Sequence, residues 1–286
     1  MIFGTIAGVQ GLRRTDEVGM LRNSLEVITC NIGDLGGYQI LTREKVVDFF
    51  KLCGIPDILL LQEVRNENEA EYFSNKLGLK YFVFFNDFQK KHGMAILSGL
   101  PLLNPDRIYF KTSKYGYGAV SADVMVGDGL KGTRNMKATG TKIQVVNVHL
   151  DRFNQITMKN KKIEVNLRSV LWFAKSEILG DSVRSQSAEE LIQWLGEKKA
   201  DNVILGGDFN SVPFSKAIRI IGSRFDDALW PSLKYLTGTY KRLNFPVAPR
   251  IDYLFLSSNL HCRQASVLPI SPGDHFPVKA VIVIGV

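Results

Sequence analysis

Cysteine is scarce in this sequence of 286 residues, and long apolar runs are missing. Its three cysteines, Cys30, Cys53 and Cys262, are too few and too far apart for a disulfide framework or a zinc site. We therefore expect small core thiols in a reducing compartment. No apolar run approaches the roughly 18 residues of a membrane span, and the first residues lack the basic and long apolar segments of a secretory signal. These absences predict a cytoplasmic protein with no transmembrane segment.

Linkers and internal repeats are missing as well. No Pro/Ser-rich or low-complexity segment divides the chain, and no fixed-period repeat occurs. An apolar fraction of 45% allows a large core, and 22% charged residues exclude a disordered chain. We predict a monomer with one large domain over residues 25–286, preceded by a loosely packed N-terminal extension (1–24) and containing a basic, partly helical insert at about 151–180.

Two sequence signatures of phosphate chemistry are also absent. The chain has neither a Cys-x₅-Arg loop nor a Gly-x₄-Gly-Lys-Ser/Thr loop. A covalent phospho-enzyme is therefore not expected.

Basic charge is present and uneven. The segment from Lys131 to Lys175 holds ten basic and two acidic residues, an excess equal to the net charge of +8 of the whole chain. Such a concentration suits a polyanionic partner, nucleic acid or an anionic membrane surface. The alternative is a solvated loop and helix face.

The most informative segment runs from Val203 to Pro213, where an apolar run passes through two glycines into Asp208 and Asn210. An apolar run closed by glycine is typical of a buried strand. Residues two apart on a strand share a face, so Asp208 and Asn210 should point into one site and Phe209 into the core. The alternative is an ordinary turn before the proline.

Polar residues also follow other apolar runs along the chain. Asn31, Glu63 and His149 each end a predicted strand, Asp252 lies in the predicted strand 250–256, and Asp274 and His275 lie in a loop between prolines. Buried polar groups must be paired, so these strand ends either converge on one site or lie separately in solvent. Strands and helices alternate in an order that predicts α/β layers with several antiparallel strands. The predicted helices are 43–52, 69–77, one through 194–195 that begins with a capping box at Ser187–Glu190, and 215–221.

These motifs, in this order, resemble the endonuclease/exonuclease/phosphatase superfamily with its DNase I-like fold, over about residues 25–286. The motifs on which this resemblance rests are Asn31, Leu-Gln-Glu63, His149-Leu, Gly-Asp208-Phe-Asn210, Arg-Ile-Asp252 and Asp274-His275. Met94-Ala-Ile-Leu-Ser-Gly-Leu-Pro101 is similar to the family's Gly-x-Ala-Ile-Leu-Ser-Arg-x-Pro strand, and Arg184-Ser-Gln186 to its Arg-x-x-Gln helix, one residue shorter.

The resemblance implies a four-layer α/β sandwich, in which two mixed, largely antiparallel sheets pack face to face between helices. It implies Mg²⁺, for which Mn²⁺ can substitute, bound by Glu63 with help from Asn31, while Asp274 shapes the metal side. Oxygen ligands suit such a hard cation. In-line attack by a water on a phosphodiester or phosphomonoester is the implied reaction.

The same resemblance assigns roles to the remaining residues. Asp208 would orient or deprotonate the water or carry a second metal, and Asn210 would donate to the phosphoryl oxygen. Asp252 would hold His275 charged, and His149 would contact phosphate or protonate the leaving oxygen. His92 lies where some relatives have a carboxylate, which leaves the partner of His149 open.

We also predict substrate contacts from Arg65 and Arg152, with an exposed loop position as the alternative for Arg65.

Three functions follow from this sequence. The first is a nuclease or nucleic-acid phosphodiesterase, favoured by the basic segment and by aromatic residues that can stack on bases (Phe153, Trp172 and Phe173), unless the latter two belong to the core. The second is a phospholipid or inositol-phosphate phosphatase or phosphodiesterase whose insert meets an anionic membrane. The third, a non-catalytic binding protein of the same fold, predicts lost ligands, and none is missing.

Overall fold

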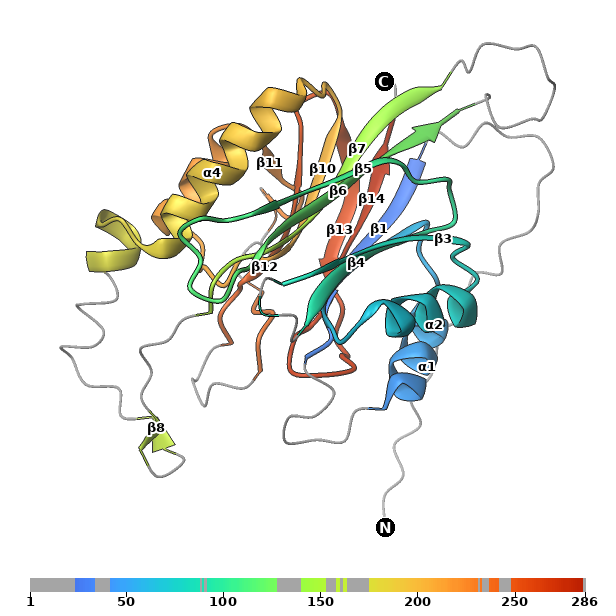
Figure 1. Cartoon of the computed structure of the whole chain (residues 1–286), viewed down its shortest axis with the longest axis horizontal. Helices are drawn as coiled ribbons and strands as arrows, with labels where there is room; N and C mark the ends of the chain where they lie inside the picture. Colours follow the sequence, from blue (N-terminus) through green and yellow to red (C-terminus); the bar gives the residue numbers. More distant parts are fainter. Residues whose placement is uncertain are drawn as a thin grey trace.

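The apolar strands pair into two sheets of six strands each, which lie face to face in the computed structural model (Figure 1). A separate two-stranded hairpin joins β8 (Met158–Lys159) and β9 (Lys162–Ile163). The structure describes residues 24–33, 42–87, 89, 92–127, 140–152, 158–159, 162–163, 175–230, 232, 237–241 and 248–284.

The first sheet contains the N-terminal strands and the last two strands of the chain. Its members are β1 (Ser24–Asn31), β2 (Ile58–Val64), β3 (Tyr81–Asn86), β4 (Gly93–Ser98), β13 (His261–Val267) and β14 (Val278–Val283). Their order is β13-β14-β1-β2-β4-β3, in which β1 and β2 run parallel and all other neighbours antiparallel. β2 and β4 are buried along their whole length because both faces of the sheet are covered.

The second sheet is built from the middle of the chain. Its members are β5 (Leu103–Tyr109), β6 (Gly118–Val126), β7 (Thr141–His149), β10 (Val203–Asp208), β11 (Asp226–Asp227) and β12 (Asp252–Leu256). Their order is β11-β12-β10-β7-β6-β5, and only β7 and β10 run parallel. The predicted class of two mixed, largely antiparallel sheets is therefore confirmed.

Helices cover the outer face of each sheet (Figure 1). Their apolar sides pack on the sheets, which buries Phe50 and Phe73 under the first sheet and Leu191 and Ile221 under the second. Each helix starts at a side chain that caps its first turn, namely Thr42, Asn66, Ser182 or Ser215. The helices are α1 (Arg43–Cys53), α2 (Glu67–Leu77), α4 (Val183–Lys198) and α5 (Lys216–Gly222), besides the π-helix η2 (Lys175–Leu179).

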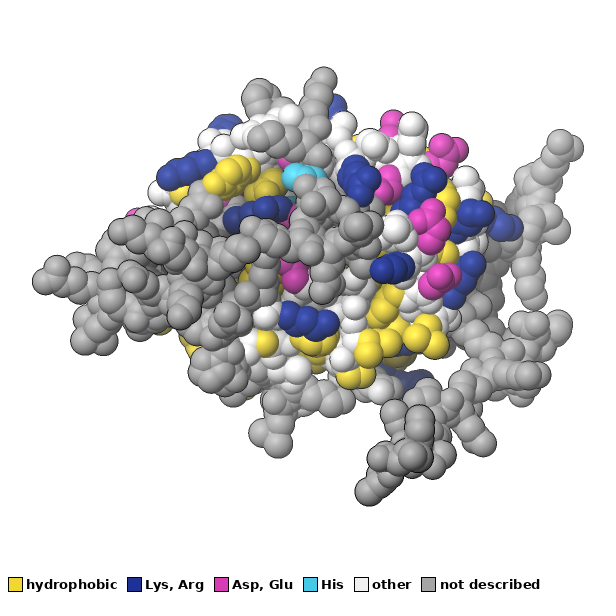
Figure 2. All heavy atoms as spheres, turned by 90° about the horizontal axis from the view of Figure 1, so that it is seen from below, with side chains coloured by type: hydrophobic (Ala, Val, Ile, Leu, Met, Phe, Trp, Pro, Cys, Tyr) yellow, Lys and Arg dark blue, Asp and Glu magenta, His cyan; other side chains and the backbone are white. Residues whose placement is uncertain are grey.

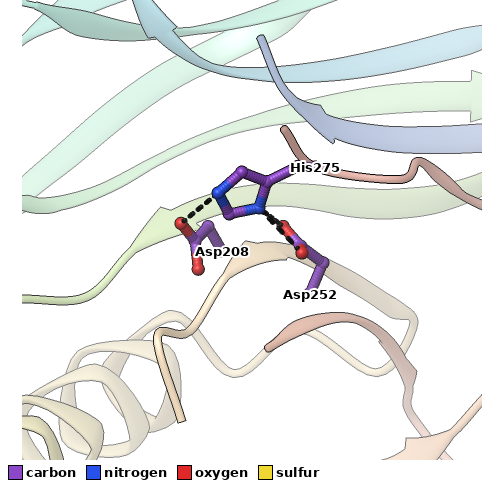
Figure 3. Close-up of side chains that lie close together, drawn as sticks. All are labelled: Asp208, Asp252 and His275. Carbon is purple, nitrogen blue, oxygen red and sulfur yellow. Dashed lines mark hydrogen bonds and ion pairs between the residues drawn. The ribbon is translucent and has the colours of Figure 1, made fainter. Parts of the chain in front are cut away.

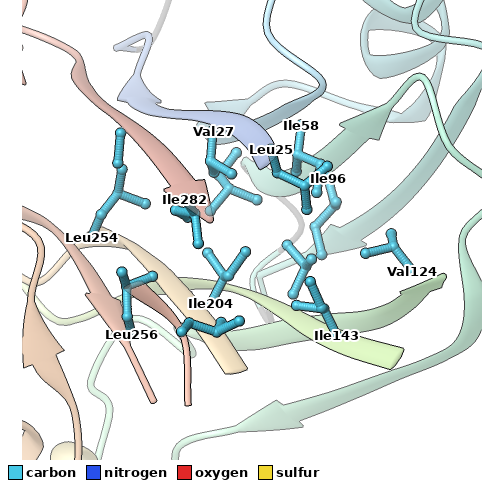
Figure 4. Close-up of a cluster of buried hydrophobic side chains, with 14 of the residues drawn as sticks. Leu25, Val27, Ile58, Ile96, Val124, Ile143, Ile204, Leu254, Leu256 and Ile282 are labelled. Carbon is cyan, nitrogen blue, oxygen red and sulfur yellow. The ribbon is translucent and has the colours of Figure 1, made fainter. Parts of the chain in front are cut away.

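The core between the sheets consists of aliphatic side chains from both (Figure 4). Val27 and Ile58 of the first sheet face Ile204 and Leu254 of the second, and all four are fully buried. Burying such a side chain contributes about 1.5–3 kcal/mol. This shared core holds the two sheets together and so brings their strand ends to one edge of the sandwich.

A buried polar link also joins the two sheets. Gln62 of β2 donates to Asn147 of β7 at 2.7 Å, and Asn147 donates to the carbonyls of Leu61 and Ala95 at 2.9 Å. Because Gln62 precedes Glu63 and Asn147 lies two residues before His149, this link fixes two predicted site residues relative to each other.

Two sequence predictions are wrong in detail. Ser187–Glu190 does not begin a helix, because α4 is capped one turn earlier by Ser182, and Glu190 accepts from the backbone N–H of Lys111 and Thr112. Strand β5 was not predicted, because it is an exposed edge strand that contains Pro105 and lacks apolar alternation.

Several predictions fall on residues outside the described ranges. These are the extension before Ser24, most of the basic segment, and the aromatic residues Phe153, Trp172 and Phe173. The described parts of the insert are the β8–β9 hairpin and η2.

Among the residues with described structure, no helix is both long and apolar enough to cross a bilayer. Cys30 is buried, Cys53 and Cys262 are half-buried, and all three thiols are free. The reducing compartment stays a prediction.

Candidate active site

Strand register in the second sheet brings three predicted residues side by side. Asp208, at the end of β10, pairs with His149 of β7 on one side and with Asp252 of β12 on the other. All three are buried. Gly207 permits this approach, since a Cβ there would lie 2.0 Å from the carbonyl oxygen of Val148, and its φ of +152° disfavours other residues.

The first sheet supplies Asn31 and Glu63 to the same place. A bulge after Gln62 gives Glu63 a φ of 59°, which breaks the alternation of side chains in β2. The Asn31 amide donates to Glu63 Oε1 at 3.1 Å and to Asp208 Oδ2 at 3.0 Å. Gly33 N–H donates to Asn31 Oδ1 at 2.9 Å, which fixes the orientation of that amide. Asn31 therefore connects the two sheets at the site.

His275 lies between two carboxylates, as Figure 3 shows. Its Nδ1 contacts Asp252 Oδ1 and Oδ2 at 3.1 and 2.9 Å, and its Nε2 lies 3.9 Å from Asp208 Oδ2. Burial lowers the pKa of His275, but Asp252 and Asp208 outweigh burial and raise that pKa to about 10. The imidazole therefore carries the proton at neutral pH.

Asp208 is ionised although it is buried. Burial raises its pKa, whereas the charge of His275 and contacts from His149 and Asn31 lower it to about 2. Its Oδ1 accepts from the backbone N–H of Asn210 at 2.9 Å. The carboxylate is thus positioned from both sides.

His149 is held by packing. Its ring stacks on Tyr117 with a centroid distance of 4.1 Å and an interplanar angle of 17°. Its Nε2 lies 3.5 Å from Asp208 Oδ2 and makes no hydrogen bond. A buried nitrogen without a hydrogen bond among the described residues is uncommon and has the capacity to bond a further group. His92, whose position left the partner of His149 open, has its Nδ1 4.0 Å from Asp87 Oδ2.

Asn210 and Phe209 separate as the strand pattern predicts. Phe209 is fully buried and packs edge-on against Tyr253 and Phe255. Asn210 has a φ of 47°, which asparagine tolerates better than most residues. Its amide donates to the Leu150 carbonyl at 3.0 Å, which leaves a second N–H on the same nitrogen.

The three remaining predicted residues differ in their placement. Asp274 Oδ1 would lie 3.5 Å from a Cβ atom added at Gly33, so this carboxylate is beside the end of β1. Arg152 binds Glu63 Oε1 at 2.5 Å. Arg65 is exposed and its backbone N–H donates to Glu69, and among the described residues no hydrogen bond or ion pair joins its side chain to the site.

The residues predicted to hold a cation fit that task. Burial raises the pKa of Glu63, but Arg152 and His149 outweigh burial and leave it below the usual value, so the carboxylate is charged. Glu63, Asn31 Oδ1 and Asp274 offer an all-oxygen set, which hard cations prefer. Asp208, Asp252 and His275 also have ligand atoms within 4.8 Å of one another. The two carboxylates hold His275 protonated, and its imidazole must lose that proton before it can bind a metal ion.

Two supporting residues escaped the sequence prediction. Tyr117 gave no signal, because an aromatic residue before a strand usually belongs to the core. Thr239 Oγ1 accepts from the backbone N–H of Ile251 and Asp252 at 2.9 and 3.1 Å, which fixes the start of β12. Both act on residues that were predicted, from segments distant in sequence.

The Arg-x-x-Gln resemblance has a different outcome. Arg184 is buried, binds Glu177 and donates to the Asp151 carbonyl at 3.2 Å. Gln186 is exposed, and Ser187, three residues after Arg184, is the buried one. Arg184 therefore anchors the segment that follows β7.

Comparisons with solved structures show the same fold at low identity. The catalytic domain of human nocturnin, solved with a bound sulfate anion, is 19% identical with a TM-score of 0.66, over 94% of this chain and 96% of that one. TDP2 of D. rerio, solved with a single-strand DNA product, is 16% identical with a TM-score of 0.62, over 91% and 98%. An endonuclease/exonuclease/phosphatase family protein of Bacteroides thetaiotaomicron is 17% identical with a TM-score of 0.63, over 92% of this chain and 98% of that one.

Two comparisons of the sequence itself complete this picture. No curated protein sequence matches this chain significantly. The family model described as Endonuclease/Exonuclease/phosphatase family matches residues 38–275, which include Glu63, His149, Asp208 and His275. The chain belongs to the Endonuclease/Exonuclease/phosphatase family.

Proposed function

We propose that this protein is a divalent-metal-dependent phosphoesterase that uses water as the nucleophile. The observation that carries the proposal is the position of Asp208, whose carboxylate is charged, buried and in contact with residues of both sheets. A buried, charged carboxylate costs folding free energy unless neighbouring groups pair with it, and such carboxylates cluster at functional sites. Here it has cationic and amide neighbours that suit a phosphate ester and a water.

We assign Mg²⁺ or Mn²⁺ to Glu63, with Asn31 and Asp274 beside it. When bound, the cation would neutralise phosphate charge and lower the pKa of a water. Asn31 orients Glu63 through the 3.1 Å hydrogen bond and contacts Asp208 with the same amide nitrogen. One residue thus positions both the proposed metal ligand and the proposed water contact.

Asp208 orients the attacking water. With a pKa of about 2 it is a weak proton acceptor, so it acts mainly by accepting a hydrogen bond from the water. The His275 imidazolium directs Nε2 toward the same place, and Asp252 holds its other nitrogen. A fixed positive donor of this kind stabilises the charge that develops on phosphate oxygens.

His149 and Asn210 complete the phosphate contacts. Nε2 of His149, which makes no hydrogen bond among the described residues, lies beside Asp208 and suits a phosphate contact or protonation of the leaving oxygen. The second N–H of Asn210 suits the phosphoryl oxygen. Both residues are supported rigidly, His149 by Tyr117 and Asn210 by the Leu150 carbonyl.

We propose nucleic acid as the substrate class. The basic segment around His149 supports this, because a polyanion gains from several positive charges. Two proteins of similar fold support it further, since one was solved with a DNA product and the other with a sulfate anion. Seen from below, the molecule has Lys and Arg side chains spread around an exposed His side chain, with acidic groups between them (Figure 2).

The test is a substrate panel assayed with Mg²⁺, with Mn²⁺ and with EDTA. It includes duplex DNA, single-stranded DNA, RNA, 5′-phosphotyrosyl DNA, sphingomyelin and inositol phosphates. We expect hydrolysis of a nucleic acid that EDTA abolishes and that Glu63→Gln reduces strongly. Faster hydrolysis of a lipid or inositol phosphate would replace the substrate class, and no hydrolysis of any phosphate ester would refute the function.

A further inference from the structure

Glu63 and Arg152 form an ion pair whose two members are very unequally buried. The Glu63 side chain is 8% exposed and the Arg152 side chain 45% exposed. Arg152 Nη2 lies 2.5 Å from Oε1, the oxygen that also accepts from Asn31. The carboxylate proposed to hold the cation therefore already has a cationic partner from this chain.

The burial of Glu63 makes such a partner necessary. A buried carboxylate loses its hydration, and a neutral amide such as that of Asn31 does not balance its charge. Arg152 is the largest of the cationic influences that lower the pKa of Glu63, ahead of His149 and His275, and a metal ion at the same oxygen would take its place. Two positive groups repel each other at one carboxylate oxygen, so the presence of one weakens binding of the other.

Arg152 is able to leave Glu63 without a change of fold. The backbone before it is fixed, because Leu150 N–H donates to the Asp208 carbonyl at 3.0 Å and Asp151 accepts from Lys114 N–H at 2.8 Å. The half-exposed side chain keeps access to water, so its release costs little desolvation energy. A swing of this one side chain would leave its guanidinium at the mouth of the site.

We propose that Arg152 and the divalent cation compete for Glu63, so that cation binding transfers Arg152 from Glu63 to the substrate phosphate. This inference rests on the proposed function. A guanidinium matches phosphate geometry with two parallel hydrogen bonds, which a released Arg152 can form. Cation and phosphate binding are then coupled through Arg152, and the coupling is reciprocal.

The first experiment measures Mn²⁺ affinity by calorimetry, in the absence of substrate. Arg152→Gln removes the competitor, and we expect it to bind Mn²⁺ at least about fivefold more tightly than the unchanged protein. Lys114→Gln is the matched control, because Lys114 is exposed and lies beside Asp151. This substitution also removes one positive charge, but it leaves the contacts of Glu63 unchanged. It should change Mn²⁺ affinity by less than about twofold. Unchanged or weaker Mn²⁺ binding by Arg152→Gln would overturn the proposal.

A second measurement follows inorganic phosphate. In the unchanged protein, Mn²⁺ should strengthen phosphate binding, and in Arg152→Gln this gain should shrink at least about fivefold. Arg152→Lys keeps a positive charge without the planar fork, so it should give an intermediate Mn²⁺ affinity and should fold if Arg152→Gln does not. An equal gain in all three proteins contradicts the transfer of Arg152 to phosphate.

Glu63→Gln separates this inference from the proposed function. If it abolishes Mn²⁺ binding while Arg152→Gln leaves Mn²⁺ affinity unchanged, the cation site stands and only the competition is refuted. If the unchanged protein binds no Mn²⁺, or if Glu63→Gln binds it normally, both the competition and the assigned cation site are refuted.

Discussion

The two sheets contribute halves of the site that differ in how their charges are satisfied. The half from the first sheet, centred on Glu63, has a partner in Arg152 that is 45% exposed and exchangeable. The half from the second sheet consists of Asp208, Asp252 and His275, which are all buried and pair with one another. A carboxylate whose cationic partner can be replaced suits the reversible binding of a ligand. Charged groups that pair with one another suit a part of the site that must keep its geometry during the reaction.

The sharpest way to break the second-sheet half is Asp208→Asn. An amide at this place has the same shape but lacks the charge that attracts His275, and it replaces one of the two acceptor oxygens by an N–H donor, so we expect kcat to fall by about 10³-fold or more. Asp106→Asn is the matched control, because Asp106 is exposed and its side chain pairs with Lys198 and accepts from the backbone N–H of Arg107, away from the site. Steady-state kinetics on the best substrate of the panel decide this, and unchanged kcat would remove Asp208 from the mechanism.

A smaller effect on activity is expected from a substitution that lowers the pKa of His275. The pKa of about 10 keeps His275 charged, so activity should persist up to pH 9 and fall as pH rises through that pKa. Asp252→Asn removes the largest raising influence, and the alkaline fall should then move toward the ordinary histidine range of about 6.5.

The measurement is the pH profile of kcat/KM for both proteins. Asp106→Asn should keep the unchanged profile. An alkaline limb that stays in place in Asp252→Asn would show that His275 is not the group that titrates.

The internal pairing of the second-sheet half also predicts how stability depends on pH. Asp208 has a lowered pKa, so its contribution of about 2 kcal/mol is present above the unfolded value of about 3.9 and is lost as pH falls toward 2. His275 has a raised pKa, so its contribution is present below about 6.5 and is lost as pH rises through about 10.

Urea unfolding from pH 2 to 10 tests both limbs. In Asp208→Asn the acid limb should become shallower, and the alkaline limb should also weaken because His275 loses one of its two carboxylates. An unchanged acid limb in that variant would contradict the low pKa.

The smallest effect is expected at Arg65, which we retain as a predicted substrate contact. Because its side chain is exposed, Arg65→Gln should raise KM by about threefold or less and leave kcat unchanged. The effect should vanish at high salt. A fall in kcat would instead place Arg65 among the groups that act in the transition state.

Much of the site was predictable from local patterns in the sequence. Polar residues at the ends of apolar strands identified Asn31, Glu63, His149 and Asp208, and Asp252 was identified at the start of β12. The two-residue period of a strand placed Phe209 in the core. The helices were predicted to within two residues where a capping side chain lies at the start, as at Asn66 and Ser215. The Ser187–Glu190 prediction failed because the same residue types also occur inside a helix, where Glu190 binds another segment.

Contacts between segments distant in sequence were not predictable. Tyr117 lies 32 positions before His149, and Arg152 lies 89 positions after Glu63, so no local pattern links either pair. The bulge at Glu63 was also invisible, because nothing in Leu-Gln-Glu-Val indicates a positive φ.

The sequence by itself determined which polar residues belong to the candidate site, because apolar periodicity indicates the strands and the polar residues lie where those strands begin or end. Tertiary structure alone decided how these groups are satisfied. Strand register places Asp208 between His149 and Asp252, and the packing of one sheet on the other brings Asn31 and Glu63 to them. Charge and pKa depend on distance and burial, which are properties of the packed sandwich and not of any single segment.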